Sequence, residues 1–206
     1  MAVPDRDVVC IARALGAEGE EVGRLVAERL GFRYADEEIV LRAAERAGLD
    51  SDLVADAEQR KSLFAGLLDY LGDGSEAAVA FADTVRVPTE VVREFIRDAV
   101  REVAADGGVV IVAHAASHAL RGERSLRVFV TAPERTRAER LAAADGLSAA
   151  DAAKAVRRSD AARADYLKRF YGVGEERSAD YDLVVNTEHL SADAAAALIV
   201  QAFGAG

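Results

Sequence analysis

A turn near the N-terminus holds the first residues that could do chemistry. In the stretch "VVCIARALGAEGEEVGRLVAERLG", residues 8–31, an apolar run leads through a turn containing Gly16 and Gly19 into an amphipathic helix. A buried strand followed by such a turn and a helix N-terminus presents backbone N–H groups to an anion. The order of these features is typical of a loop that binds phosphate.

The turn lacks the side chains of the regular phosphate-binding motif, in which a glycine and four residues precede Gly-Lys-Ser/Thr. From its first glycine onward it reads Gly16, Ala17, Glu18, Gly19, Glu20 and Glu21. Two like charges ~4 Å apart repel by ~1 kcal/mol in water and by ~4 kcal/mol at an effective dielectric of ~20. Acids in a first helical turn also stabilise the helix, by ~0.3–1 kcal/mol each. A phosphate loop and an ordinary structural turn both stay open on spacing alone.

Composition restricts the classes of function. The 206-residue chain has a net charge of -10, which argues against non-specific binding to nucleic acid. Its one cysteine, Cys10, lies in an apolar run and is compatible with a reducing compartment. We see no signal peptide and no apolar run long enough to span a bilayer, so we expect a cytoplasmic protein without a membrane partner.

The apolar pattern predicts the fold. Short β-branched runs predict strands over residues 8–12, 109–113, 126–132 and 181–187, and residues 32–35 predict a fifth, shorter strand. Helical stretches separate these runs, which indicates a parallel sheet with helices on both faces, a three-layer α/β fold. We expect one domain over residues 1–206, with a helical insertion at about 50–87 and helices that begin after Ser148 and Ser191. The carboxyl ends of the strands would then meet where ligands bind.

Several motifs follow one another in a recognisable order. "IARALGAEG" keeps Ile11, Arg13, Gly16 and Gly19 of the pattern Ile-Ser-Arg-x-x-Gly-Ser-Gly-Gly, and "LGFRYADEEIV" follows with Asp36 in place. "VVIVAHAASHAL", "VFVTAPERTRAERL", "RRSDAARADYLKRFYGV" and "YDLVVNTEHLS" come next. This order resembles the cytidylate kinase-like family of nucleoside monophosphate kinases, over nearly the whole chain and least clearly over residues 50–85.

The resemblance implies a P-loop NTPase-like fold with a C-terminal helical lid at about residues 145–178. It also implies phosphoryl transfer from ATP, with Mg²⁺, to a nucleoside monophosphate such as CMP. The nucleotide phosphates would lie against Arg13 and residues 16–21. The cations expected to neutralise developing charge are on the lid: Arg157, Arg158 and Arg163.

One acid is expected to organise the lid arginines. Asp160 lies three positions from both Arg157 and Arg163 on one predicted helix, so it could orient both guanidinium groups. A solvated helix face with ordinary ion pairs is the alternative for this segment.

The acceptor side depends on two residues. Asp36 could hold an acceptor nucleotide or a metal-bound water, or simply cap a helix. His114 stands where the family has an arginine, and a neutral imidazole cannot replace a bidentate guanidinium. His114 and His118 have the i, i+4 spacing of zinc ligands, but without a third ligand nearby we predict no metal site of protein ligands.

Two functions therefore compete. An active nucleotide kinase is favoured by the lid arginines. A catalytically impaired relative that senses nucleotide or binds protein is favoured by the acidic turn and His114. The apolar helices over residues 60–100 could pair with a second copy, so a homodimer is a further expectation.

Overall fold

The computed structural model describes residues 7–35, 89–113, 116–121 and 124–205. Its centre is a five-stranded sheet of order β2-β3-β1-β4-β5, in which every neighbouring pair is parallel. The strands are β1 (Val8–Arg13), β2 (Arg33–Ala35), β3 (Val109–Val112), β4 (Ser125–Thr131) and β5 (Leu183–Asn186). The predicted parallel α/β sheet is confirmed, and each predicted strand overlaps an observed one.

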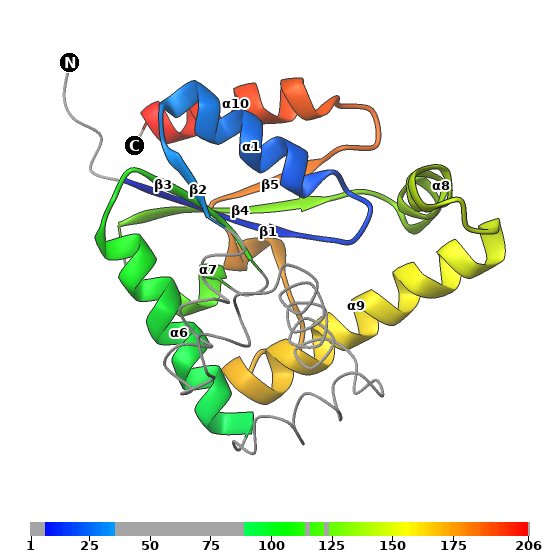
Figure 1. Ribbon diagram of the computed structural model, residues 1–206, viewed down its shortest axis with the longest axis horizontal. Helices are drawn as coiled ribbons and strands as arrows, with labels where there is room; N and C mark the ends of the chain where they lie inside the picture. The colour runs from blue at the N-terminus through cyan, green and yellow to red at the C-terminus, as the bar shows by residue number, and fades with distance from the viewer. Residues whose placement is uncertain (1–6, 36–88, 114–115, 122–123, 206) are drawn as a thin grey trace, which may run out of the picture.

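Helices cover both faces of the sheet, as the pattern predicted (Figure 1). On one face lie α1 (Gly19–Leu30) and α10 (Ala192–Gly204), which pack against each other. On the other side lie α6 (Thr89–Ala105), α7 (Ala116–Ala119) and α9 (Ala149–Tyr171). Between β4 and α9, α8 (Glu134–Asp145) stands beyond the carboxyl end of the sheet, and a short 3-10 turn, η1 (Ser178–Asp180), precedes β5.

The core explains why the central strands are almost continuously apolar. Val9 and Ile11 of β1 have no exposed surface, and neither does Val128 on β4. A parallel strand with a neighbour on each side and helices above and below is buried on both faces, so alternation of polar and apolar residues disappears. Cys10 is buried here too, and burial raises the pKa of its thiol to about 12.

Local signals fix several helix ends. The Ser148 hydroxyl accepts a hydrogen bond from the Asp151 N–H at 3.1 Å, and the Ser191 hydroxyl accepts one from the Ala194 N–H at 3.2 Å. Gly31, at φ +67°, ends α1 in the left-handed conformation that favours glycine. Both predicted caps are confirmed.

The strand register brings the carboxyl ends of three strands together. Arg13, the last residue of β1, lies opposite Val130, and Thr131 of β4 lies opposite Asn186 of β5. The loops that follow these strands therefore meet at one edge of the sheet. The predicted insertion at about 50–87 lies outside the described residues. Among the described helices, none has the length and apolarity needed to cross a bilayer.

Candidate phosphate-binding site

Residues 14–18, here called the β1–α1 loop, connect the carboxyl end of β1 to the first turn of α1. The loop opens with a hydrogen bond from the Ala14 N–H to the Val130 carbonyl at 3.0 Å, and the Ala17 N–H bonds the Ala14 carbonyl at 3.1 Å. The first bond of the helix runs from the Val22 N–H to the Glu18 carbonyl at 3.0 Å. The amides of residues 19–21 precede this bond, so no helical carbonyl accepts from them. Amides of this kind can bind an anion.

Two loop residues have positive φ angles. Gly16 has φ +77°, and a Cβ added to it would lie 2.6 Å from the Arg137 carbonyl oxygen, so both conformation and space require glycine. Glu18, at φ +61°, is the only non-glycine residue with positive φ in the described parts of the chain. For a residue with a Cβ this conformation costs roughly 1–2 kcal/mol. The loop therefore holds a glutamate in a conformation better suited to glycine.

Each of the three acids near the loop has an arginine partner. A carboxylate oxygen of Glu18 lies 3.4 Å from Arg140 Nε, and Glu20 forms an ion pair with Arg13. Glu21 is 3.9 Å from Arg24. The sequence left the orientation of these acids open. In the folded chain their charges are matched by cations, so an approaching phosphate meets less repulsion than the sequence alone suggests.

Arg140 of α8 anchors the loop region to β5. Its guanidinium donates to the Thr187 hydroxyl at 3.0 Å and to the Thr187 carbonyl at 2.6 Å. The Thr187 hydroxyl is itself 3.0 Å from the Ala17 carbonyl. The sequence analysis missed Arg140. The signal for it was an arginine in the first turns of the helix that follows a strand's carboxyl end.

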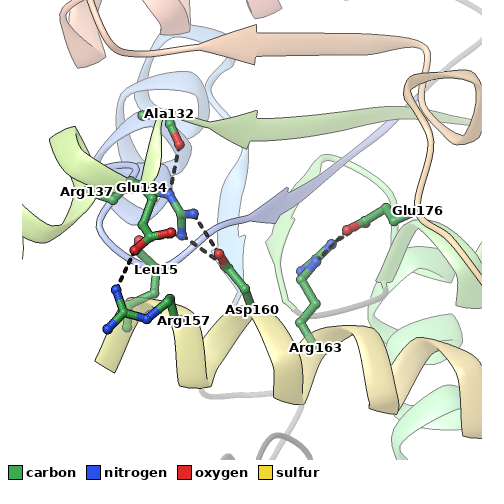
Figure 2. A network of polar contacts seen from close by, with 8 residues as sticks. All are labelled: Leu15, Ala132, Glu134, Arg137, Arg157, Asp160, Arg163 and Glu176. Atoms are coloured by element: carbon green, nitrogen blue, oxygen red, sulfur yellow. Dashed lines mark hydrogen bonds and ion pairs between the residues drawn. The ribbon is translucent and has the colours of Figure 1, made fainter. Parts of the chain in front are cut away.

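Arg137, one turn earlier on α8, was also missed, and its partners come from three different parts of the chain (Figure 2). Its Nε donates to the Ala132 carbonyl at 2.8 Å, and Nη1 donates to the Leu15 carbonyl at 3.3 Å. Both Nη atoms bond the carboxylate of Asp160, at 2.9 and 2.7 Å. Only 7% of the Arg137 side chain is exposed. One guanidinium thus connects the end of β4, the β1–α1 loop and α9.

The expected role of Asp160 is wrong. It does not orient Arg157 and Arg163 but binds Arg137, while Arg157 binds Glu134 at 2.8 Å and Arg163 binds Glu176 (Figure 2). Neighbours three positions apart on a helix gain only a few tenths of a kcal/mol from pairing. A bidentate pair with a guanidinium on a facing helix is stronger and more directional.

Arg163 is buried among polar and aromatic partners. It donates to both carboxylate oxygens of Glu176, at 2.8 and 2.6 Å, and to the Tyr181 hydroxyl at 3.1 Å. Its guanidinium lies over the Phe129 ring at 5.1 Å. Burial opposes the charge of Arg163, but the hydrogen bonds and charge of Glu176 outweigh it and raise the arginine's pKa. Burial also opposes the charge of Glu176 and by itself would raise the pKa of this carboxyl. The hydrogen bonds and charge of Arg163 outweigh burial and hold the pKa of Glu176 below its usual value.

A cavity of about 220 Å³ lies between the carboxyl ends of β1 and β4 and the inner side of α9. Its polar lining comes from Thr131, Arg137, Asp160, Arg163, Glu175 and Glu176. Its apolar lining comes from Ala14, Phe129, Ala164, Leu167 and Val173. Arg137 and Arg163 therefore border a pocket next to the β1–α1 loop. Contacts with the strand ends and with neighbouring helices hold both arginines in place.

Other predicted site residues are not brought into this cluster. Arg158 is exposed on α9, whereas Asp36 and His114 lie outside the described residues. His118 of α7 packs beside Tyr171 and Tyr181, with ring centroids 5.5 and 6.4 Å away. Because His114 lies outside the described residues, the expectation that His114 and His118 form no metal site stays a prediction.

The donors at this loop suit an oxyanion better than they suit a metal ion held by protein alone. The amides at the start of α1 and the guanidinium of Arg140 lie together at the β1–α1 loop, as phosphate oxygens require. The described part of the chain contains no group of three or more His, Cys, Asp or Glu side chains arranged around one metal position. Mg²⁺ is commonly bound by one or two carboxylates together with substrate phosphates, and the carboxylates beside this loop are those of Glu18, Glu20 and Glu21.

Comparison with known proteins agrees with this architecture. The family model described as the cytidylate kinase-like family matches residues 8–189. A uronate isomerase from Corynebacterium glutamicum is 27% identical over 156 residues, and the match spans 76% of this chain and 29% of that protein. The chain therefore spans less than a third of that relative's length.

Solved structures show the same fold at low sequence identity. An uncharacterized protein from Eubacterium ventriosum has a TM-score of 0.66 at 16% identity, covering 98% of this chain and 100% of that one. Shikimate kinase from Bacteroides thetaiotaomicron has a TM-score of 0.53 at 15% identity, covering 94% of each chain. Shikimate kinase from Acinetobacter baumannii, solved with shikimate, has a TM-score of 0.53 at 13% identity, covering 98% of this chain and 95% of that one. These likenesses establish a P-loop-kinase-like fold.

Proposed function

The chain belongs to the cytidylate kinase-like family, and on that premise we propose that it transfers a phosphoryl group from ATP to a nucleoside monophosphate, with CMP as the first acceptor to test. The observation that carries this proposal is the meeting of one loop and three guanidinium groups. The β1–α1 loop leads into the N-terminus of α1 at the carboxyl end of the central strand, and Arg137, Arg140 and Arg163 reach that end from α8 and α9.

The donor phosphates bind at the first turn of α1 in this proposal. Backbone amides and the helix dipole stabilise negative charge there without a lysine. Arg140 supplies a cation next to the loop, where its Nε lies 3.4 Å from a carboxylate oxygen of Glu18. Where the regular motif has lysine and a hydroxyl, this chain has Glu20 and Glu21, so its arginines carry more of the charge stabilisation.

The transferred group lies toward the cavity beside α9. Phosphoryl transfer needs little covalent work from the protein, which positions the reactants and neutralises charge that develops between them. Arg163 is suited to that task because Glu176, Tyr181 and Phe129 hold it in one place, so little reorganisation is needed. Mg²⁺, when bound with the nucleotide, would supply further positive charge to the same stabilisation.

A second candidate is a family member that binds nucleotide and turns it over slowly or not at all. The specific observation in its favour is that carboxylates already bind the main cations: Asp160 binds Arg137, and Glu176 binds Arg163. A phosphate must compete with these carboxylates for the same N–H donors. The absence of the loop lysine points in the same direction.

Calorimetry and an enzyme assay separate the two candidates. ATP is titrated into the protein with and without Mg²⁺, and a coupled assay follows ADP release with CMP, dCMP, UMP, AMP, GMP and shikimate as acceptors. Binding with turnover of a monophosphate supports the kinase. Binding without turnover of any acceptor supports the second candidate. Failure to bind ATP at millimolar concentration contradicts both.

A further inference from the structure

We propose that Arg137 and Asp160 are positioning residues that fix the β1–α1 loop and make its conformation depend on α9. Describing this loop as phosphate-binding rests on the function proposed above. The mechanical statement, that an acid on α9 holds the loop through an arginine on α8, rests on contacts alone.

Arg137 touches the loop with both its backbone and its side chain. A Cβ added to Gly16 would lie only 2.6 Å from the Arg137 carbonyl oxygen. The loop backbone therefore packs directly on α8. The Arg137 guanidinium donates to the carbonyl of Leu15, the preceding loop residue, at 3.3 Å. Two consecutive loop residues are therefore positioned by one residue of α8.

Asp160 determines where that guanidinium can lie. The Arg137 side chain is 7% exposed, and Asp160 is the carboxylate that its two Nη atoms bind. A buried guanidinium without a carboxylate is costly, so it would turn toward water or another acid when Asp160 loses its charge. Either movement takes Nη1 away from the Leu15 carbonyl. The conformation of the loop therefore depends on the position of α9.

A second ion pair between the same two helices serves as the matched control. Arg157 of α9 binds Glu134 of α8 at 2.8 Å, with 59% and 47% of the side chains exposed. Figure 2 shows this pair beside the Arg137–Asp160 pair. The hydrogen bond and ion pair of Arg157 and Glu134 are with each other and include no residue of the loop, so breaking this pair loosens α8 from α9 without removing a contact to the loop.

The test measures amide hydrogen exchange in the full chain without nucleotide, comparing wild type with Asp160→Asn, Asp160→Glu and Glu134→Gln. Asp160→Asn should speed exchange over residues 15–21 by about tenfold, the loss of one charge-assisted contact, and leave exchange in β1 and β4 unchanged. Asp160→Glu should restore most of the protection, and Glu134→Gln should leave the loop at wild-type rates. A purely structural role would instead change exchange throughout α8, α9 and the strands.

Two results overturn the inference: unchanged loop exchange in Asp160→Asn, or equal acceleration in Glu134→Gln. ATP titration of the same variants then relates the loop to function, with weaker binding expected for Asp160→Asn alone. If the wild-type protein binds no ATP, the proposed function fails, while the exchange result still decides the positioning role.

Discussion

The hydroxyl of Thr187 lies 3.0 Å from the carbonyl oxygen of Ala17 and can donate a hydrogen bond to it, joining residues 170 positions apart. Neither residue has exposed surface. The same hydroxyl accepts a hydrogen bond from Arg140 at 3.0 Å. The end of β5, the first turns of α8 and the β1–α1 loop are therefore joined through one small side chain.

Replacing Thr187 with valine tests this junction. The substitution keeps the shape and removes the hydroxyl, which leaves the buried Ala17 carbonyl without its partner. We expect a loss of about 1–3 kcal/mol in the free energy of unfolding, measured by urea denaturation. Thr187→Ser keeps the hydroxyl and should lose less, so equal losses for both variants would argue against the hydrogen bond as the cause.

Glu18 tests the left-handed position in the loop. Glu18→Gly removes both the charge and the strain of φ +61°, whereas Glu18→Ala removes only the charge. We expect the glycine variant to be more stable than the alanine variant by about 1 kcal/mol, since a Cβ is disfavoured in this conformation. Under the proposed function, calorimetry should also show tighter ATP binding for Glu18→Gly. Equal stability of the two variants would show that the conformation carries little strain.

Glu176 and Glu134 offer a comparison between a buried and an exposed ion pair. Glu176→Gln removes the charge that compensates Arg163, whose side chain is 8% exposed, and should cost about 3 kcal/mol of unfolding free energy. Glu134→Gln weakens the exposed pair with Arg157 and should cost less than about 1 kcal/mol. Urea denaturation at neutral pH measures both. Losses of similar size would mean that burial does not set the strength of the Arg163 pair.

His118 should make stability depend on pH. Its Nε2 is buried without a hydrogen-bond partner, and burial lowers the pKa of the imidazole below 6.5, against the charges of Glu176 and Asp180, which raise it. Below about pH 6.5 the imidazole is protonated more readily in the unfolded chain than in the folded one. The free energy of unfolding therefore falls as the pH drops through this value. His118→Phe should flatten the dependence between about pH 7.5 and 5.5, measured as the urea midpoint. An unchanged slope in the variant would assign the pH dependence to other groups.

Much of the architecture could be predicted because it depends on local pattern. The continuous apolar run around Val9 and Ile11 indicated a strand covered on both sides, and the serines before α9 and α10 marked helix starts. Each of these signals acts within a few residues. The parallel order followed from strands alternating with helices, since only crossover connections join strands in that way.

The site was less predictable because its partners are distant in sequence. Asp160 had two arginines at helical spacing, yet it binds Arg137, 23 residues away on another helix. Arg163 binds Glu176, beyond the end of its own helix. Spacing identifies which side chains can meet within a helix, but it cannot rank them against partners that arrive from other elements.

The sequence by itself therefore determined the strands, the helix starts and the place of the β1–α1 loop, because apolar periodicity and capping are properties of short segments. Only the tertiary structure decided that Glu18 pairs with Arg140 and Glu20 with Arg13, and that Arg137 holds the loop to α9. The physical reason is that charge pairing depends on burial and on distances between elements. Both of these exist only once the sheet has aligned its strand ends and the helices have packed around them.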